Sequence, residues 1–162
     1  MSAALLKNSQ SNDLLNKIHV MWEKDSQIDP TKIESASLEI PKLHSKYLQL
    51  LDHCKTSLRQ LERKSAIVVR DRFLWYEGKL DKNLIDDYGW KYDPYDGLHI
   101  KTKSHKDLFL NSDPIIGTIE DEISVIKNSI DTLDEIMGSI RFRSNLIKNI
   151  IENRKLETGM GF

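Results

Sequence analysis

The sequence predicts a mainly α-helical protein, with long helices at about residues 30–77 and 114–156, a short N-terminal helix and an irregular loop region. Two observations predict this fold. Apolar residues recur every three or four positions through both long segments, which is the period of a helix face. Each segment also starts at an Asp-Pro pair, where Asp can cap free amides and Pro fits the first turn. We expect the 162 residues to form a single domain.

The N-terminal part is expected to provide one short docking helix. Residues 1–10 are small and polar and are predicted to be flexible. From Asn12 to Lys24 apolar residues return at helical spacing and form a wide apolar face. They are Leu14, Leu15, Ile18, Met21 and Trp22.

The first long helix has a clear start, a clear stop and one expected defect. It begins at Asp29-Pro30. Pro41 is expected to kink or interrupt it, because proline removes a backbone donor and clashes with the preceding turn. Gly78 is the predicted stop, since glycine readily adopts the left-handed conformation that ends helices.

Residues 79–113 are expected to be a loop-rich insertion. Tyr88-Gly89-Trp90 and the stretch from Asp93 to Gly97 are typical of turns, with room for one short extended piece. The insertion is expected to pack over the helices without a core of its own. At the other end of the chain, residues 157–162 are predicted to form a flexible tail.

The last long helix carries a sustained heptad seam, which continues beyond Ser144 with Ile147 and Ile151. Two interpretations of the seam stay open: it associates with other copies of the chain, or it is buried in the chain's own bundle. The first interpretation predicts that one set of seam residues forms the oligomer. This set comprises Ile119, Ile123, Ile126, Ile130, Leu133, Met137 and Ile140.

Composition narrows the class of protein. The net charge is only -1, but the signs are segregated, with basic residues from Lys55 to Lys79 and acidic ones from Ile115 to Ile140. The single Cys54 excludes an intrachain disulfide. With no export signal and no membrane-spanning run in the sequence, a cytoplasmic protein that does not enter a membrane is expected.

A basic stripe on the first long helix predicts binding to nucleic acid. Lys55, Arg59, Arg63 and Arg70 fall within an arc of about 80° along about 22 Å of helix. Such a stripe can follow several phosphates, although a merely solvated basic face is the alternative. Arg72 and Lys79 fall instead on the apolar side, where charges are paired at an interface or line a channel.

Aromatic residues lie beside these cations. Phe73, Trp75 and Tyr76 follow Arg70 and Arg72, and aromatic faces next to guanidinium groups suit the binding of unstacked bases. Aromatic residues at a helix end also commonly belong to a core. The predicted nucleic-acid-binding residues are Lys55, Arg59, Arg63, Lys64, Arg70, Arg72, Trp75, Tyr76 and Lys79.

The sequence contains no catalytic or metal-binding motif. Glu77-Gly78-Lys79 lacks the first glycine and the final hydroxyl residue of a phosphate-binding loop. The histidines lack the H-E-x-x-H pattern, and Cys54 beside His53 has no signature of a catalytic pair. We therefore expect a protein that is not an enzyme and needs no metal or other cofactor.

Two segments resemble a known family. Residues 70–79 are similar to the basic-x-basic, aromatic, Tyr-x-Gly-Lys segment of the UvsY family of recombination mediators, found in T-even-like phages and cyanophages. Residues 40–48 are similar to a second stretch of the cyanophage branch, and the order of elements from Leu14 to Glu157 also agrees. The loop around Trp90 departs from the T-even pattern.

The resemblance implies a function. It implies a ring-like homo-oligomer, a hexamer or heptamer, that binds single-stranded DNA through a basic pair corresponding to Arg70 and Arg72. It also implies displacement of a single-strand-binding protein and loading of a phage recombinase in an infected host bacterium. Two other functions fit the same residues: a structural coiled-coil assembly protein and an RNA-binding helical module.

Overall fold

The structure is a computed structural model that describes residues 3–100 and 102–159, with side chains described from residue 13 onward except at residue 101. All its regular elements in these ranges are helices, which confirms the predicted fold class. In chain order they are α1 (Ala3–Asp25), the 3-10 helix η1 (Pro30–Lys32), α2 (Ile33–Tyr76), α3 (Lys82–Tyr88), α4 (Lys103–Asn111) and α5 (Pro114–Glu157).

Two compact units divide the chain, and α2 and α5 each contribute to both. Unit 1 comprises residues 1–57 and 125–162, and unit 2 comprises residues 58–124. None of the helices within the described ranges combines the length and the apolar character needed to cross a membrane. The single domain predicted from the sequence stays a prediction.

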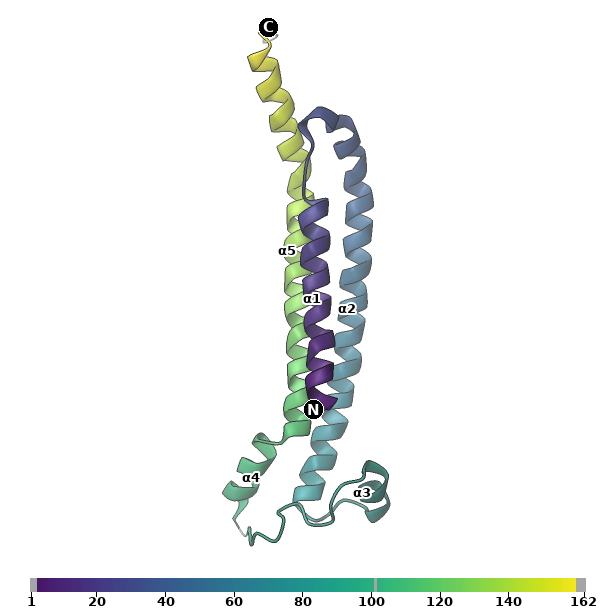
Figure 1. The fold of residues 1–162 in the computed structure, drawn as a ribbon, viewed down its shortest axis with the longest axis vertical. Coiled ribbons are helices and arrows are strands. Elements are labelled where there is room, and N and C mark those ends of the chain that lie inside the picture. The colour runs from purple at the N-terminus through teal and green to yellow at the C-terminus, as the bar shows by residue number, and fades with distance from the viewer. Residues whose placement is uncertain (1–2, 101, 160–162) are drawn as a thin grey trace. The chain divides into compact units, whose positions relative to one another are not determined.

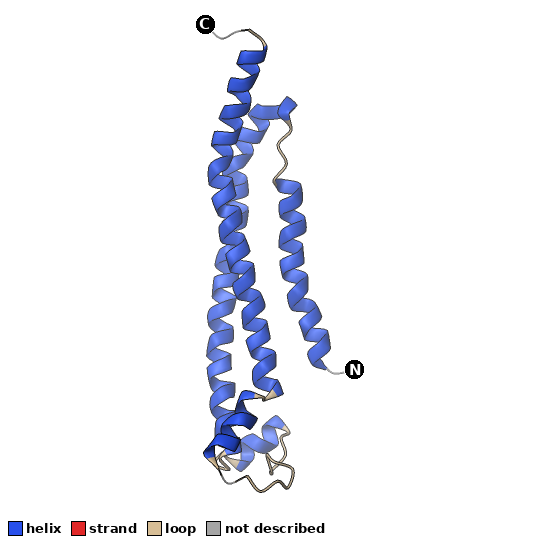
Figure 2. Ribbon diagram, turned by 90° about the vertical axis from the view of Figure 1, so that its left-hand side faces the viewer, coloured by secondary structure: helices blue, strands red, loops and turns tan. Residues whose placement is uncertain are grey.

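Unit 1 is a bundle in which α1 lies beside the first part of α2 and the later part of α5 (Figures 1 and 2). Tyr47 and Leu133 are fully buried at its centre, and Trp22 packs edge-on against Tyr47 with ring centroids 5.5 Å apart. Interlocking of apolar side chains from the three helices excludes water from this core. Its buried members are Ile18, Tyr47, Leu51, Cys54, Leu133, Ile136, Met137 and Ile140.

The heptad seam of α5 largely serves this core. Leu133, Met137 and Ile140 are buried within unit 1, and Ile119 is buried as well. Ile123, Ile126 and Ile130 are half-buried. Ile136, which lies outside the predicted seam, is also buried. The interpretation of the seam as part of the chain's own bundle therefore holds for its central residues.

Unit 2 has a second, aromatic core where α3, α4 and the intervening loops pack on the end of α2. Trp75, Tyr76, Leu80 and Ile85 are its buried residues. The expected extended piece is absent from the described part of the insertion, which instead contains α3 and α4. The insertion does pack over α2, but it takes part in a core with α2 that the sequence did not predict.

Helix ends follow the predicted signals. Asp29 caps η1 by accepting a hydrogen bond from the Thr31 amide at 2.8 Å. Gly78, with a φ of 68°, follows the end of α2 as predicted. Helix α2 contains Pro41 and continues from Ile33 to Tyr76, so the predicted interruption does not occur. Pro41 lies on the exposed side of the helix.

The N-terminal helix is longer than predicted. Helix α1 begins at Ala3, so residues 3–10, which were expected to be flexible, are helical. At the other end, α5 stops at Glu157 and is followed by a turn at 158–159. Residues 1–2 and 160–162 of the predicted flexible ends lie outside the described residues.

Candidate nucleic-acid interface

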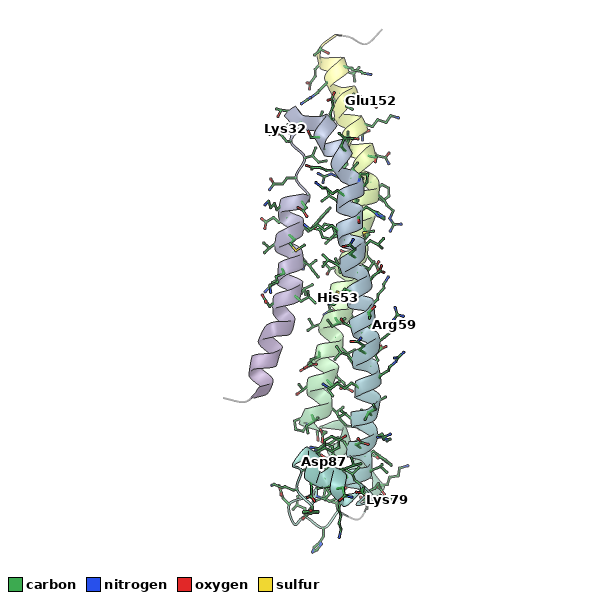
Figure 3. The ribbon with its side chains drawn as sticks, turned by 90° about the vertical axis from the view of Figure 1, so that its right-hand side faces the viewer. Lys32, His53, Arg59, Lys79, Asp87 and Glu152 are labelled. Atoms are coloured by element: carbon green, nitrogen blue, oxygen red, sulfur yellow. The ribbon has the colours of Figure 1, made fainter. Side chains whose placement is uncertain are left out.

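Exposed cations lie along the part of α2 that belongs to unit 2. Arg59, Arg63 and Lys64 are all exposed, and Figure 3 shows Arg59 on an outward-facing side of α2. At about 100° per residue, Arg59, Arg63 and Arg70 fall within an arc of about 40°. We call Arg59, Arg63 and Arg70 the basic row. Lys64 lies about 100° away from Arg63 on the same helix.

Lys55 differs from the basic row. It belongs to unit 1 and is half-buried, and its Nζ lies 3.9 Å from a carboxylate oxygen of Asp134 on α5. Lys55 therefore takes part in charge pairing between α2 and α5.

Arg70 is held in place by a buried carboxylate. Its Nε donates to Asp71 Oδ1 at 2.8 Å, and its Nη2 lies 2.7 Å from the same oxygen. The side chain of Asp71 is only 2% exposed, whereas that of Arg70 is 63% exposed. Asp71 thus fixes one edge of the guanidinium group and leaves the rest of it accessible to a phosphate.

Tyr88, at the end of α3, shares that carboxylate with Arg70. Its hydroxyl donates to Asp71 Oδ2 at 2.8 Å, and its ring stacks on Trp90 with centroids 4.4 Å apart and planes at 22°. The hydrogen bond to Asp71, together with partial burial, raises the pKa of Tyr88. Tyr88 is nevertheless 43% exposed.

Arg72 is buried and does not belong to the basic row. Its Nε donates to Asp113 Oδ2 at 2.6 Å, and its Nη2 contacts the same oxygen. The guanidinium carbon lies 4.0 Å from the ring centroid of Trp75 and 4.5 Å from that of Trp90. The sequence predicted this charge on the apolar side of α2, either paired or lining a channel. In the structure it is paired, with Asp113.

Trp75 and Tyr76 also lie in the core of unit 2. They are 8% and 7% exposed, so neither ring offers a face to an unstacked base in this structure. Trp75 Nε1 donates to the Lys91 carbonyl at 2.7 Å, and the Tyr76 hydroxyl donates to Asp113 at 2.9 Å. Burial and the hydrogen bond to Asp113 raise the pKa of Tyr76. Of the two interpretations of the aromatic residues at the helix end, core packing therefore applies to Trp75 and Tyr76.

Lys79 follows α2 and remains exposed. Its side chain is 68% exposed, and its Nζ lies 3.5 Å from Glu77 Oε2. Lys106 of α4 donates to the other oxygen of Glu77 at 3.0 Å. This hydrogen bond, with the charges of both lysines, lowers the pKa of Glu77 against the opposing effect of burial. Figure 3 places Lys79 at the end of unit 2 that also carries Asp87 of α3.

Two residues of this region were missed by the sequence analysis. Asp113 was interpreted only as a helix cap, although it also binds Arg72. Tyr88 was assigned to a turn, whereas it ends α3, between the N-cap Asp81 and the C-cap Gly89. The Asp81 and Gly89 pair is a signal that could have identified α3.

Comparisons with known proteins agree with this arrangement of helices. Residues 21–160 match the family described as the recombination, repair and ssDNA binding protein UvsY. Comparison with curated protein sequences gives no significant match.

Two crystal structures of the bacteriophage T4 recombination mediator protein UvsY, in two lattice types, share the fold with a TM-score of 0.71 and 20% identity. They cover 88% and 87% of this chain, and 96% and 98% of their own chains. Because the family match extends over most of the sequence, this chain belongs to the UvsY family of recombination, repair and single-stranded-DNA-binding proteins.

Proposed function

We propose that this protein is a recombination mediator that binds single-stranded DNA on unit 2 through the basic row. The observation that carries the proposal is the alignment of Arg59, Arg63 and Arg70 on one exposed side of a continuous helix. Lys64 and Lys79 are further exposed cations of unit 2. Family membership supports the choice of single-stranded DNA as the ligand.

Arg72 has a different role in this proposal. Its charge is neutralised by Asp113 and covered by aromatic rings, so we assign it to holding unit 2 together. Trp75 and Tyr76 share this supporting role, whereas the phosphate contacts are assigned to exposed cations. Lys55, paired with Asp134, is assigned a minor share of the binding.

Loading of the recombinase follows from such a surface. A protein that holds the strand mainly by its backbone leaves most bases free for an incoming recombinase and competes with a single-strand-binding protein for phosphates. Neither step requires bond chemistry by the mediator itself. We propose that it displaces the single-strand-binding protein and nucleates the recombinase filament in the cytoplasm of an infected bacterium.

Self-association strengthens weak sites. A few phosphate contacts per chain give modest affinity, but several linked copies on one strand raise it through effective concentration. We propose a homo-oligomer, a ring of six or seven copies. Leu133, Met137 and Ile140 fill the core of unit 1 and are not available for contacts between copies. We therefore assign these contacts to the apolar residues of α5 that remain exposed. Half-buried Ile123, Ile126 and Ile130 are further candidates.

The salt dependence of binding tests the proposed DNA site. Replacing Arg59, Arg63 and Arg70 together by Gln removes three cations from the row. For single strands the log–log salt slope changes by roughly 0.7 for each phosphate neutralised, so the slope should fall in magnitude by about 2. Fluorescence anisotropy with a labelled oligo(dT) at several salt concentrations measures it.

A second triple variant distinguishes loss of the proposed DNA site from a general reduction in positive charge. Lys17, Lys32 and Lys148 belong to unit 1, and their side chains are 67%, 74% and 73% exposed. Replacing these three lysines by Gln removes the same charge and should leave the slope almost unchanged. Equal loss in the two triple variants would contradict the assignment, and tighter binding of RNA or duplex DNA would contradict the choice of ligand.

Loading is tested in a mixture with the phage recombinase and its single-strand-binding protein. The mediator should shorten the lag before filament growth on coated DNA, and the triple arginine variant should not. A mediator that binds DNA normally but leaves the lag unchanged would restrict its role to DNA binding.

A further inference from the structure

The proposed site accounts for the phosphates but leaves one exposed feature of unit 2 without a role. Tyr88 stands beside Arg70, and the two residues bind opposite oxygens of the Asp71 carboxylate. One face of the Tyr88 ring is covered by Trp90, and no other ring contacts Tyr88 among the described residues. With 43% of the residue exposed, the ring has an accessible surface next to a cation.

We propose that Tyr88 is a base-stacking residue for single-stranded DNA, receiving the base of a nucleotide whose phosphate is bound by Arg70. The proposal rests on the proposed function, because it assumes that the strand follows the basic row. Aromatic rings next to backbone-binding cations are the general means of holding unstacked bases without reading their sequence.

Preorganisation favours Tyr88 over other exposed aromatics. Its ring is held by the stack on Trp90 at 4.4 Å and by the hydroxyl bond to Asp71 at 2.8 Å, so little side-chain freedom is lost on binding. Trp90 in turn lies against the guanidinium group of Arg72, at 4.5 Å. Phe73 is 45% exposed on α2 but has no comparable ring or hydrogen-bond support among the described residues.

The buried ion pair between Arg72 and Asp113 supports this stacking site. Asp113 fixes Arg72, the Arg72 guanidinium packs against Trp90, and Trp90 supports Tyr88. Through these contacts, Arg72, Trp75 and Tyr76 of α2 have a role in DNA binding although they are buried. In the proposal they are positioning residues, and the groups that touch DNA are Arg70 and Tyr88.

An oligonucleotide without bases separates stacking from phosphate binding. We expect the wild-type protein to bind oligo(dT) on the order of tenfold more tightly than an abasic strand of equal length. Tyr88→Leu should lose most of that difference while its affinity for the abasic strand stays within about twofold. Tyr88→Phe keeps the ring and should retain most of the preference.

Tyr92 provides the matched control. It is an exposed tyrosine of the same loop region, at 62%, with its hydroxyl on Asp86 and no ring neighbour among the described residues. Tyr92→Leu should leave the preference for oligo(dT) intact. Circular dichroism of each variant checks that the helices are retained.

Crosslinking provides a test that needs no variant. A strand carrying 5-iodouracil reacts on irradiation with aromatic rings stacked on the base, and mass spectrometry of the wild-type complex should identify Tyr88. Crosslinks at Phe73 or Tyr92 instead would overturn the stacking role.

The binding measurements can also overturn it. A loss of affinity in Tyr88→Leu that is equal for oligo(dT) and for the abasic strand would do so. If the wild-type protein bound oligo(dT) and the abasic strand equally, with salt dependence, the stacking role would be wrong but the proposed function would stand. If it bound neither strand, the proposed function itself would be wrong.

Discussion

Asp113 connects the two long helices within unit 2. Its Oδ1 accepts the amides of Ile115 and Ile116, at 2.9 Å and 3.1 Å, and so caps the start of α5. Its Oδ2 accepts from Arg72 and from the Tyr76 hydroxyl near the end of α2. One carboxylate therefore joins the end of one long helix to the start of the other. A cap motif in the sequence shows only the first of these roles, because the second comes from contacts that are distant along the chain.

The first prediction concerns this buried pair. Arg72→Met leaves the Asp113 charge buried without its partner and should lower the free energy of unfolding by about 3–5 kcal/mol. Adding Asp113→Asn removes that charge while Asn still caps α5, so the double variant should recover part of the loss. Urea denaturation followed by circular dichroism and by tryptophan fluorescence measures both free energies.

Arg70 provides the contrast for this experiment. Because the Arg70 side chain is 63% exposed and buried Asp71 keeps the hydrogen bond from the Tyr88 hydroxyl, Arg70→Met should destabilise the protein less than Arg72→Met does, while weakening DNA binding. Equal destabilisation by Arg70→Met and Arg72→Met would contradict the division between a binding and a supporting arginine.

Individual elements could be predicted wherever the signal is local. Asp29, Gly78 and Asp113 end or start helices through contacts within a few residues, so the bounds of α2 and α5 followed from the sequence. The short helices α3 and α4 were missed because their stability comes from packing on the aromatic core of unit 2. The site was partly predicted: the cations of α2 were recognised, but which of them are buried depends on long-range packing.

Within unit 1, helix α1 is held by polar contacts at its C-terminal end as well as by its apolar face. Buried Arg143 of α5 donates to the carbonyls of Asp25, Ser26 and Gln27 at 2.9–3.1 Å, satisfying groups that a helix end leaves without partners. Asp25 accepts from Lys46 at 2.5 Å and from the Tyr47 hydroxyl at 3.0 Å. Burial opposes ionisation of Asp25, but the hydrogen bonds from Lys46 and Tyr47 outweigh it and lower its pKa.

The second prediction is a pH dependence of this docking. Since the folded pKa of Asp25 lies below the ordinary value of 3.8, its contribution is complete above that value and is lost as the pH falls through the lowered one. Asp25→Asn should reduce stability at neutral pH by about 1–3 kcal/mol. The difference between wild type and variant should narrow below about pH 4 in thermal melts.

An exposed carboxylate of the same helix is the control. Asp13 pairs with Lys17 at 2.6 Å, and its side chain is 55% exposed, so Asp13→Asn should have a small effect on stability at neutral pH. A difference between wild type and Asp25→Asn that stays constant down to pH 3 would contradict the role of the ionised Asp25.

At the scale of the whole molecule, the main residues proposed to bind DNA and those near the end of α5 proposed to join copies of the chain belong to separate units. The basic row and the Tyr88 stack lie in unit 2, whereas the long apolar core and the exposed apolar residues near the end of α5 belong to unit 1. At about 100° per residue, Phe142, Leu146 and Leu156 fall within an arc of about 80° on the side of α5 opposite Leu133. They are 67%, 53% and 73% exposed.

The third prediction is that this outer side of α5 joins copies of the chain. Phe142→Ser with Leu146→Ser removes exposed apolar surface without opening the core, so helicity and melting temperature should change little. The variant should sediment as a smaller species. Leu133→Asp, by contrast, places a charge at a fully buried position of unit 1 and should unfold it before any question of assembly arises.

Val20 and Leu38 are equally exposed apolar residues on other helices of unit 1, at 66% and 81%, and replacing both by Ser should leave the assembly intact. If linked copies provide the avidity, the variant with Phe142→Ser and Leu146→Ser should bind long strands about a hundredfold or more weakly than the wild type. It should bind a strand short enough to contact one chain with the affinity of the wild type. Sedimentation velocity and anisotropy on short and long oligo(dT) measure both quantities. A smaller species that still binds long strands with full affinity would show that each chain holds DNA on its own.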